Sequence, residues 1–381
     1  MIYFDNGATT FPKPESVTRE MLGAVRTAAN PGRGGHRLSL RGSELMYRCR
    51  EDVARLFSMD DPSRVIFAPN CTAALNTVIQ GSLKSGDHAV ISSLEHNAVA
   101  RPLEALRRRG VTYSIADAVD GDDDATVDNF RRAIRQNTRM IVCTHASNVF
   151  GVRLPVERLG ALCRIYGLLF CVDAAQTAGV APIKLGGSDI DFLCTAGHKG
   201  LYGPMGTGLL LINSDAVPES LIQGGTGSLS SSLDQPELLP DRFESGTPNL
   251  PGIAGLSAGV RFVMSHRGLL ERESALAAML YDRLSAVNGV KLYTSRPEPS
   301  RYMPVLSFNI EGEDSERVAA VLNDRFGIAV RAGLHCAPLA HRSYGTLDTG
   351  TVRAVVSAFT TRAQVEFFAD SLYRISNLMK K

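Results

Sequence analysis

A single lysine, Lys199, lies in a glycine-rich stretch between two apolar runs of the sequence. The segment Gly197-His198-Lys199-Gly200 follows Phe192-Leu193-Cys194 and precedes the run from Leu209 to Ile212. A lysine between two buried strands is crowded, and a crowded ammonium loses its proton readily and becomes a nucleophile. The stretch therefore suits a lysine that forms a Schiff base with a carbonyl compound. An ordinary turn whose lysine extends into solvent explains it equally well, so the rest of the chain must decide.

Other polar residues follow apolar runs that are typical of buried strands. They are Asn70-Cys71-Thr72-Ala73, Glu95-His96, His145 with Ser147 and Asn148, and Asp173 with Gln176. In an open α/β sheet, ligands bind outside the carboxyl ends of the strands, so these groups are expected to lie along one edge with Lys199. Each group taken alone also has a structural explanation, such as a helix start, a turn residue or a hydrogen-bonded core histidine. Their joint placement favours a binding site.

This set of side chains matches the requirements of pyridoxal 5′-phosphate (PLP). The phosphate needs N–H and hydroxyl donors, which a helix starting near Thr72 offers. The ring nitrogen needs a carboxylate to stay protonated, and Asp173 is the candidate. The aldehyde needs Lys199, the ring face accepts an aromatic side chain such as His96, and the phenolic oxygen needs a donor such as the amide of Asn148.

Strands and helices alternate along most of the chain, which predicts an α/β fold. Strands are expected at 65–68, 89–92, 112–115, 140–144, 168–172, 192–194 and 209–212, and helices at 15–27, 39–57, 70–80, 99–109, 127–135 and 156–166. Continuous apolar strands separated by helices indicate a mostly parallel seven-stranded sheet with helices on both faces. The acidic run from Asp120 to Asp124 is expected to be a solvated loop.

The C-terminal third of the chain has a different pattern. Residues 214–250 form a long loop region, and loops of this length are usually functional or mobile. Helices are then expected at about 253–287, 315–325 and 362–378, with strands at 290–293, 305–309, 328–331 and 352–356. We therefore predict a segment at 1–14 that packs with the small domain, a large cofactor-binding domain at 15–250, and a small α+β domain at 251–381.

Composition excludes several classes of function. The 381 residues carry a net charge of +2, so charge gives no reason to expect nucleic acid or a membrane surface as partner. The apolar runs are short, and the N-terminus does not have the pattern of a signal peptide. The seven cysteines form no C-x-x-C pair, and most lie in apolar segments. This usage is typical of buried thiols in a reducing cytoplasm.

The sequence resembles the class V aminotransferase-fold family of PLP enzymes (fold type I), and within it the cysteine desulfurases and selenocysteine lyases. The segments that carry the resemblance are spread over nearly the whole chain: Tyr3 to Thr10, Glu95-His96-Asn97, His145 to Gly151, Val172 to Gln176, Gly197-His198-Lys199, Arg242 to Asn249, and Arg331 to Ala337. The short spacing from Arg331 to Cys336 resembles the desulfurase group that has a short cysteine loop and usually passes sulfur to a dedicated acceptor protein.

The resemblance implies a role for each matching residue. For the cofactor, Lys199 forms the Schiff base, Asp173 pairs with the ring nitrogen, His96 stacks on the ring and moves protons, Gln176 and Asn148 lie near the phenolic oxygen, and Thr72, Ala73 and His198 hold the phosphate. Thr247 and Gly225 reach the phosphate of the other subunit, which implies a homodimer. For the substrate, Arg353 binds the carboxylate and Asn148 lies near it, Arg331 and His36 are further substrate-binding residues, and Cys336 is the nucleophile that takes up sulfur.

Four positions depart from the family pattern, namely Ala196, Gly200, Asn97 and Leu334. The family usually has serine or threonine before Gly-His-Lys, where this chain has Ala196, so Thr195 is a candidate substitute for the missing phosphate donor. Leu334 replaces a frequent histidine beside the cysteine. A thiol must be a thiolate to attack, and His335 and Arg331 are the neighbours expected to favour that state.

The resemblance implies conversion of L-cysteine to L-alanine, with transfer of the sulfur to Cys336 as a persulfide for sulfur trafficking such as Fe–S cluster assembly. Selenocysteine lyase is the alternative. An aminotransferase or C–S lyase that does not use the thiol, and a PLP-binding or sulfur-carrying partner without catalysis, also remain open. A zinc site of His335, Cys336 and His341 lacks a fourth ligand at suitable spacing. A nucleotide-binding protein would need a Walker or G-x-G-x-x-G motif that we do not find.

Overall fold

The helices and strands of the computed structural model, which describes residues 1–32 and 34–378, follow the expected alternation. The helices are α1 Glu15–Thr27, α2 Arg37–Leu56, η1 Pro62–Arg64 (3-10), α3 Cys71–Ser82, α4 Asn97–Arg107, α5 Asp123–Ala133, α6 Val156–Tyr166, α7 Leu250–Ser265, α8 Leu269–Ser285, α9 Ser315–Phe326, α10 Pro338–Ser343 and α11 Arg362–Leu378. The strands are β1 Ile2–Tyr3, β2 Val65–Ala68, β3 His88–Ser92, β4 Thr112–Ala116, β5 Thr138–Thr144, β6 Leu169–Asp173, β7 Phe192–Ala196, β8 Gly208–Ile212, β9 Val290–Leu292, β10 Val305–Ile310, β11 Ile328–Ala329 and β12 Val352–Val355.

The large sheet has seven strands in the order β2-β8-β7-β6-β5-β3-β4. Strand β8 is antiparallel to both of its neighbours, while β7, β6, β5, β3 and β4 pair in parallel. The carboxyl ends of β2, β3, β5, β6 and β7 therefore lie at one edge of the sheet. The prediction of a mostly parallel seven-stranded sheet is confirmed.

Successive side chains of these strands enter two separate cores. In β5, Ile141 and Cys143 pack with residues of α2, α5 and α6, whereas Met140 and Val142 pack with residues of α3 and α4. Side chains of a strand alternate between the two faces of its sheet, so helices must cover both faces to bury them. This double covering explains why the strands read as continuous apolar runs.

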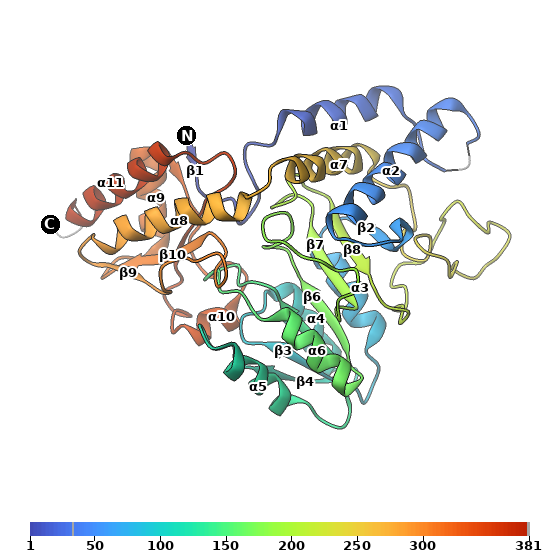
Figure 1. The fold of residues 1–381 in the computed structure, drawn as a ribbon, viewed down its shortest axis with the longest axis horizontal. Helices are drawn as coiled ribbons and strands as arrows, with labels where there is room; N and C mark the ends of the chain where they lie inside the picture. The colour runs from blue at the N-terminus through green and yellow to red at the C-terminus, as the bar shows by residue number, and fades with distance from the viewer. Residues whose placement is uncertain (33, 379–381) are drawn as a thin grey trace.

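Helix α7 packs against the large part of the chain. Leu250 and Ala254 of α7 contact Ala24 of α1 and Leu45 of α2, and the three helices lie side by side in Figure 1. Leu256 and Val260, further along α7, belong to the core on the face of the large sheet that α2, α5 and α6 cover. We therefore propose that the boundary predicted at residue 251 lies after α7, near residue 266.

The small domain has its own core around the antiparallel sheet β9-β10-β12. Helices α8, α9 and α11 lie together around this sheet, beside the N-terminus of the chain (Figure 1). Strand β1 pairs with β11, and Phe4 packs on Phe368 in the same core. The N-terminal segment thus makes its first contacts with the small domain.

Three local predictions were wrong or incomplete. The acidic run is not a loop throughout, because Asp122 caps α5 and Asp123 and Asp124 form its first turn, where carboxylates stabilise the positive end of the helix. The strand expected at 328–331 is the short β11, which pairs with β1 and not with the three-stranded sheet. The short helix α10 was not expected. Among the described residues, no helix is long and apolar enough to cross a membrane.

Candidate active site

Lys199 follows β7 directly, on a loop whose shape is fixed by backbone hydrogen bonds. The N–H of Gly203 donates to the carbonyl of Gly197, and that of Tyr202 to the carbonyl of Lys199. Desolvation lowers the pKa of Lys199, while Asp173 and Cys71 act in the opposite direction and Arg353 and Arg331 add to the lowering. The structure therefore brings Lys199 among the predicted carboxylate and arginines, with an amine that loses its proton more readily than an exposed lysine.

Asp173 ends β6, next to β7 in the sheet, and is 4% exposed. Its Oδ1 accepts a hydrogen bond from the N–H of Ala175 at 2.9 Å and lies 3.5 Å from the Sγ of Cys71, which donates to it. Cys71 is the first residue of α3, so this contact joins the ends of two strands. The two donors fix the carboxylate in one orientation, as a partner for a ring nitrogen requires.

His96 precedes α4 as its N-cap, and its Nδ1 accepts a hydrogen bond from the N–H of Ala98 at 3.0 Å. An accepting Nδ1 places the ring proton on Nε2. Burial lowers the pKa of His96 to about 4, and the charges of Asp173 and Lys199 both act on it. The predicted ring-stacking residue therefore lies beside the predicted lysine and carboxylate as a neutral imidazole.

The N-terminus of α3 carries the predicted phosphate donors Thr72 and Ala73. Asn70 caps this helix, and its Oδ1 already accepts the N–H of Ala73 at 2.8 Å, while Thr72 is exposed. His198 has a buried Nδ1 without a hydrogen-bond partner in the described structure. A buried polar nitrogen left without a partner needs a group to bind it. The helix start and His198 therefore fit a phosphate, with Thr72 as the better placed of the two α3 donors.

Thr195 is poorly placed for the phosphate role that the sequence suggested. Its hydroxyl is fully buried and donates to the carbonyl of Ala174 at 3.3 Å. Thr195 and Ala196 are neighbours in β7, and side chains alternate between the two faces of a strand. Thr195 thus lies on the face opposite to the position that the family uses, and the geometry does not support it as a substitute.

The two amides make contacts that their sequence context did not predict. Gln176 donates through Nε2 to the carbonyl of Gly7 at 3.1 Å. Asn148 donates through Nδ2 to the carbonyl of His335 at 2.8 Å, and its buried Oδ1 has no partner among the described residues. Asn148 thereby joins the end of β5 to the cysteine loop, and its free oxygen can accept a hydrogen bond from a bound ligand. His145, the residue that follows β5, lines a separate cavity of about 150 Å³ with Val172.

Arg353 in β12 is 1% exposed and is held from two sides. Its Nη1 donates to the carbonyl of Asn148 at 2.8 Å, and its Nη2 pairs with Oδ1 of Asp5 at 2.9 Å. A Cβ on Gly7 would lie 2.9 Å from the guanidinium carbon, so the glycine permits this close approach. The Nε of Arg353 is buried without a partner in the described residues, which leaves a donor available to a substrate carboxylate.

Cys336 is the only exposed cysteine among the described residues, and the other six are buried. The Nη2 of Arg331 lies 4.0 Å from its Sγ. Both His335 and Cys336 have left-handed backbone conformations, with φ of 49° and 57°. Such strain in non-glycine residues persists only where surrounding contacts enforce it, and it is concentrated at functional sites. The loop is held by Asn148 and by the N–H of Asn97, which donates to the carbonyl of Cys336 at 2.8 Å.

His335 does not supply the positive charge expected beside the thiol. Its ring is buried, its Nε2 lies 3.0 Å from the carbonyl of Thr351, and burial lowers its pKa to about 2. The ring is therefore neutral at physiological pH, and Arg331 is the cation beside Cys336. The zinc alternative gains no support, because the described residues contain no group of three or more possible metal ligands.

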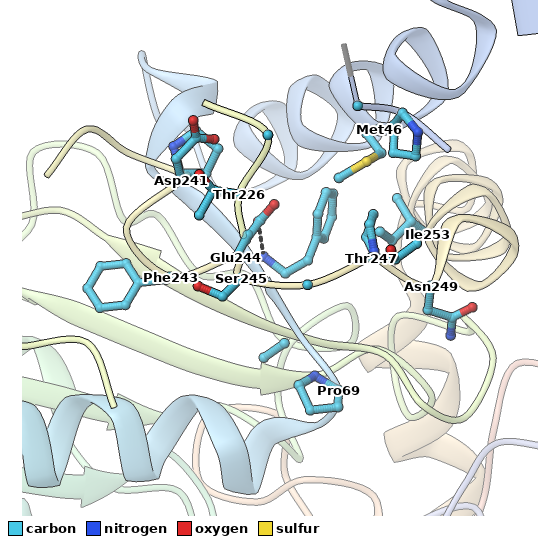
Figure 2. Close-up of a pocket in the computed structure, with 18 of the residues that line it drawn as sticks. Met46, Pro69, Thr226, Asp241, Phe243, Glu244, Ser245, Thr247, Asn249 and Ile253 are labelled. Carbon is cyan, nitrogen blue, oxygen red and sulfur yellow. Dashed lines mark hydrogen bonds between the residues drawn. The ribbon is translucent and has the colours of Figure 1, made fainter. Parts of the chain in front are cut away.

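The predicted cross-subunit residues lie around a different cavity. Gly225 and Thr247 line a hollow of about 650 Å³ whose lining does not include Lys199. Figure 2 shows Thr226, Glu244, Ser245 and Thr247 around this hollow, together with Met46 of α2 and Ile253 of α7. His36 is exposed at the start of α2, where its Nδ1 caps the N–H of Ser39. None of these three residues lines the small cavity that includes Lys199.

The N-terminal segment contributes contacts that the sequence did not reveal. The carbonyl of His198 accepts hydrogen bonds from the N–H of Thr10 at 3.1 Å and from the Nζ of Lys13 at 2.7 Å. The hydroxyl of Thr10 also donates to the carbonyl of Lys199 at 3.1 Å. The repeated Thr-Thr and the following lysine were the available signal, but only tertiary structure shows what they bind. This segment holds the lysine loop in place from outside the sheet.

Comparisons with known proteins agree with this arrangement. The family model for class-V aminotransferases matches residues 2–368. A probable cysteine desulfurase of Methanothermobacter thermautotrophicus is 32% identical over 99% of this chain and 95% of its own length, and one of Pyrococcus abyssi is 32% identical over 97% and 92%. Among solved structures, an apo cysteine desulfurase from Thermococcus onnurineus superposes with a TM-score of 0.90 at 32% identity, covering 99% of this chain and 94% of that one. The cysteine desulfurase CsdA from Escherichia coli gives 0.88 at 27% identity, with the same coverage.

Proposed function

Because the chain belongs to the class-V aminotransferase family, whose members are PLP enzymes, we propose that it is a PLP-dependent cysteine desulfurase. In this reaction L-cysteine and the thiol of Cys336 yield L-alanine and a persulfide on Cys336. The observation that carries the proposal is the convergence of Lys199, Asp173 and His96 with the one exposed thiol, beside Arg331. Full-length similarity to proteins named cysteine desulfurases supports it.

The cofactor, when bound, supplies an aldehyde that takes up the substrate amine and a ring that withdraws electrons from the substrate Cα. Asp173, oriented by Ala175 and Cys71, is the residue that would keep the ring nitrogen protonated. Thr72 and His198 would hold the phosphate. The buried nitrogen of His198 and the buried oxygen of Asn148, which have no partner among the described residues, are the structural features that fit such a ligand.

The protein's own residues divide the remaining tasks. Lys199 would hold the aldehyde of the cofactor, and as a neutral amine it would accept the proton from the substrate Cα. His96, which is neutral, can carry a proton near the same atoms. Arg353 presents its unpaired Nε to the substrate carboxylate. The Cys336 thiolate, stabilised by Arg331, attacks the substrate sulfur, forming the S–S bond as the C–S bond breaks and Cβ gains a proton to complete alanine.

The decisive experiment follows alanine and sulfide from L-cysteine in the presence of excess dithiothreitol, for the wild type beside Cys336→Ala. We expect stoichiometric alanine and sulfide from the wild type and a loss of at least about 100-fold in the variant, because the nucleophile is missing. Equal turnover of the variant on cysteine would exclude the persulfide mechanism and favour a C–S lyase. A parallel assay with L-selenocysteine distinguishes the lyase alternative, since faster selenide release that survives Cys336→Ala would favour it.

We further propose that the enzyme is a homodimer in which Thr247 and Gly225 complete the phosphate site of the partner. Both residues line the hollow in Figure 2, away from their own Lys199. The test mixes the inactive variants Lys199→Ala and Thr247→Ala after unfolding and refolding them together. If Thr247 serves the partner's site, the hybrid contains one native site and regains activity. If Thr247 serves its own subunit, the hybrid keeps only damaged sites and stays at the level of the parents.

A further inference from the structure

Tyr202 lies three residues after Lys199 and has a conformation that is unusual for an aromatic residue. Its φ is 56°, in the left-handed region where glycine is the ordinary choice. The residue is fully buried, and its N–H donates to the carbonyl of Lys199 at 2.8 Å. A side chain that large persists in such a conformation only where its own contacts offset the strain.

The contacts of the Tyr202 side chain extend to two other parts of the chain. The N–H of Ala358, after β12 in the small domain, donates to the Tyr202 hydroxyl at 2.8 Å. The hydroxyl in turn lies 3.3 Å from Oε1 of Glu273 in α8. The ring packs edge-on against Phe262 of α7 at a centroid distance of 5.0 Å. One side chain thus joins the lysine loop to α7, α8 and the small domain.

Glu273 is an unusual partner for this hydroxyl because it is buried with no salt bridge among the described residues. It is 2% exposed, and desolvation raises its pKa to about 8, with Tyr202 and Arg272 acting in the opposite direction. The carboxyl is therefore neutral near pH 7 and can share a hydrogen bond with the tyrosine hydroxyl. A buried carboxyl is costly to retain, so a purely apolar packing role does not explain it.

The pair also lies close to the proposed reaction centre. Lys199, Tyr202 and Glu273 line one cavity of about 30 Å³, together with Gln176 and Ser357. That volume is about what one water molecule occupies in the liquid. The lysine loop and the small domain, including its helix α8, therefore meet at this cavity, which Lys199 also lines.

We propose that Tyr202 and Glu273 are a positioning pair that holds the Lys199 loop against the small domain during the reaction. Neither residue touches the substrate in this proposal, which rests on the proposed function. The pair fixes the turn from Gly197 to Gly203 and ties it to the segment that follows Arg353. Its loss frees the loop and slows the steps that use the Lys199 amine, while the binding of substrate through Arg353 is kept.

The test compares Tyr202→Phe, Glu273→Ala and Glu273→Gln with the wild type, as full-length cofactor-loaded protein. We expect Tyr202→Phe and Glu273→Ala to lower kcat about tenfold with KM within about twofold, the size expected for one buried hydrogen bond that serves the transition state. Glu273→Gln should restore kcat to within about twofold, because a neutral amide mimics the neutral carboxyl. The matched control is Tyr113→Phe, which removes an exposed tyrosine–glutamate hydrogen bond to Glu104 of 2.9 Å and should leave kcat unchanged.

A second measurement separates this inference from the proposed function. Amide hydrogen exchange of the cofactor-free protein should be faster in the peptide spanning residues 197–203 in Tyr202→Phe and Glu273→Ala, and unchanged in Tyr113→Phe. If Tyr202→Phe and Glu273→Ala both show the exchange rate and the kcat of the wild type, the positioning role of the pair is wrong. It is also wrong if Glu273→Gln is as slow as Glu273→Ala. If the wild type releases no alanine, the proposed desulfurase activity is wrong. The exchange measurement still tests whether Tyr202 and Glu273 position the lysine loop. If Tyr202→Phe does not fold, the two Glu273 variants decide it alone.

Discussion

The candidate site has a lysine side, formed by Lys199, Asp173 and His96, and a cysteine side, formed by Cys336 and Arg331. The two sides provide opposite environments for their reactive groups. Lys199, Asp173 and His96 come from the ends of buried strands, where desolvation lowers the pKa of the lysine and of the histidine. Cys336 comes from a strained loop of the small domain, is exposed, and has a guanidinium 4.0 Å from its sulfur. Burial lowers the pKa of the lysine and of the histidine on one side, and on the other side a guanidinium lies close to an exposed thiol.

This difference follows from the chemistry proposed for each side. A Schiff-base lysine and its proton transfers need an amine without its proton, which a dry site favours. A sulfur carrier must be accessible to whatever removes the sulfur, so its thiolate has to be stabilised by a neighbouring charge and not by burial. The two sides meet only through contacts between domains, such as those of Asn148 with His335 and of Asn97 with Cys336.

The largest expected effect comes from breaking the lysine side. Lys199→Ala should lower alanine formation about 10⁴-fold, because both the covalent anchor and the proton acceptor are lost. Borohydride reduction of the PLP-loaded protein, followed by peptide mass spectrometry, should find the cofactor on Lys199 in the wild type and on no lysine in the variant. Lys199→Arg is the control that keeps the charge, and it should be as inactive as the alanine variant. Label on another lysine of the wild type would contradict the assignment.

Two threonines then test where the phosphate binds, Thr72 at the start of α3 and Thr195 in β7. Thr72→Val should weaken PLP binding about tenfold, because a hydrogen bond to a charged phosphate is lost. Thr195→Val should change it less than about twofold, since the Thr195 hydroxyl already donates to Ala174. Titration of the cofactor-free variants with PLP, followed by fluorescence, measures both. A larger effect at Thr195 than at Thr72 would restore the prediction made from the sequence.

The lysine side was predictable because parallel strands align their carboxyl ends whatever the details of packing. Asp173, His96 and Lys199 each follow an apolar strand, so the alternation of strands and helices alone brings them to one edge. Side chains alternate between the two faces of a strand, so Thr195 and its neighbour Ala196 lie on opposite faces. This rule argues from the sequence alone against Thr195 as a phosphate donor.

The cysteine side was not predictable in the same way, because its features arise from docking between segments far apart in the sequence. The residue types around His335 do not show that its ring is buried against Thr351 and is neutral. The clamp of Thr10 and Lys13 on the His198 carbonyl likewise depends on the path of the N-terminal segment. Sequence identifies which residues can react, and tertiary contacts decide their charge and orientation.

The cation of the cysteine side gives a moderate effect. Arg331→Met should slow alkylation of Cys336 by iodoacetamide about fivefold at pH 7, because two unit charges 4 Å apart in water interact by about 1 kcal/mol. The control is Arg342→Met, which removes an exposed arginine of α10 and should leave the rate unchanged. The wild type should incorporate one label per native chain, since the other six cysteines are buried. An unchanged rate in Arg331→Met would mean that the guanidinium does not stabilise the thiolate.

The smallest effect tests the contact that joins the two sides. Asn97 is the first residue of α4, and its N–H donates to the carbonyl of Cys336 at 2.8 Å. Proline is tolerated at this helix position, and His96 before it already has the extended conformation that a following proline requires, with ψ of 155°. Asn97→Pro therefore removes this one hydrogen bond and keeps the helix.

Loss of a single backbone hydrogen bond costs about 1 kcal/mol, so we expect sulfide release to slow about threefold to fivefold in Asn97→Pro. Amide exchange in the peptide around residues 333–337 should rise at the same time, because the strained His335–Cys336 conformation loses one of the hydrogen bonds that hold it. Asn97→Ala keeps the N–H and is the matched control. If the proline variant slows the reaction without faster exchange in that loop, the effect comes from His96 on the lysine side, and the two sides share α4 more closely than the hydrogen bonds indicate.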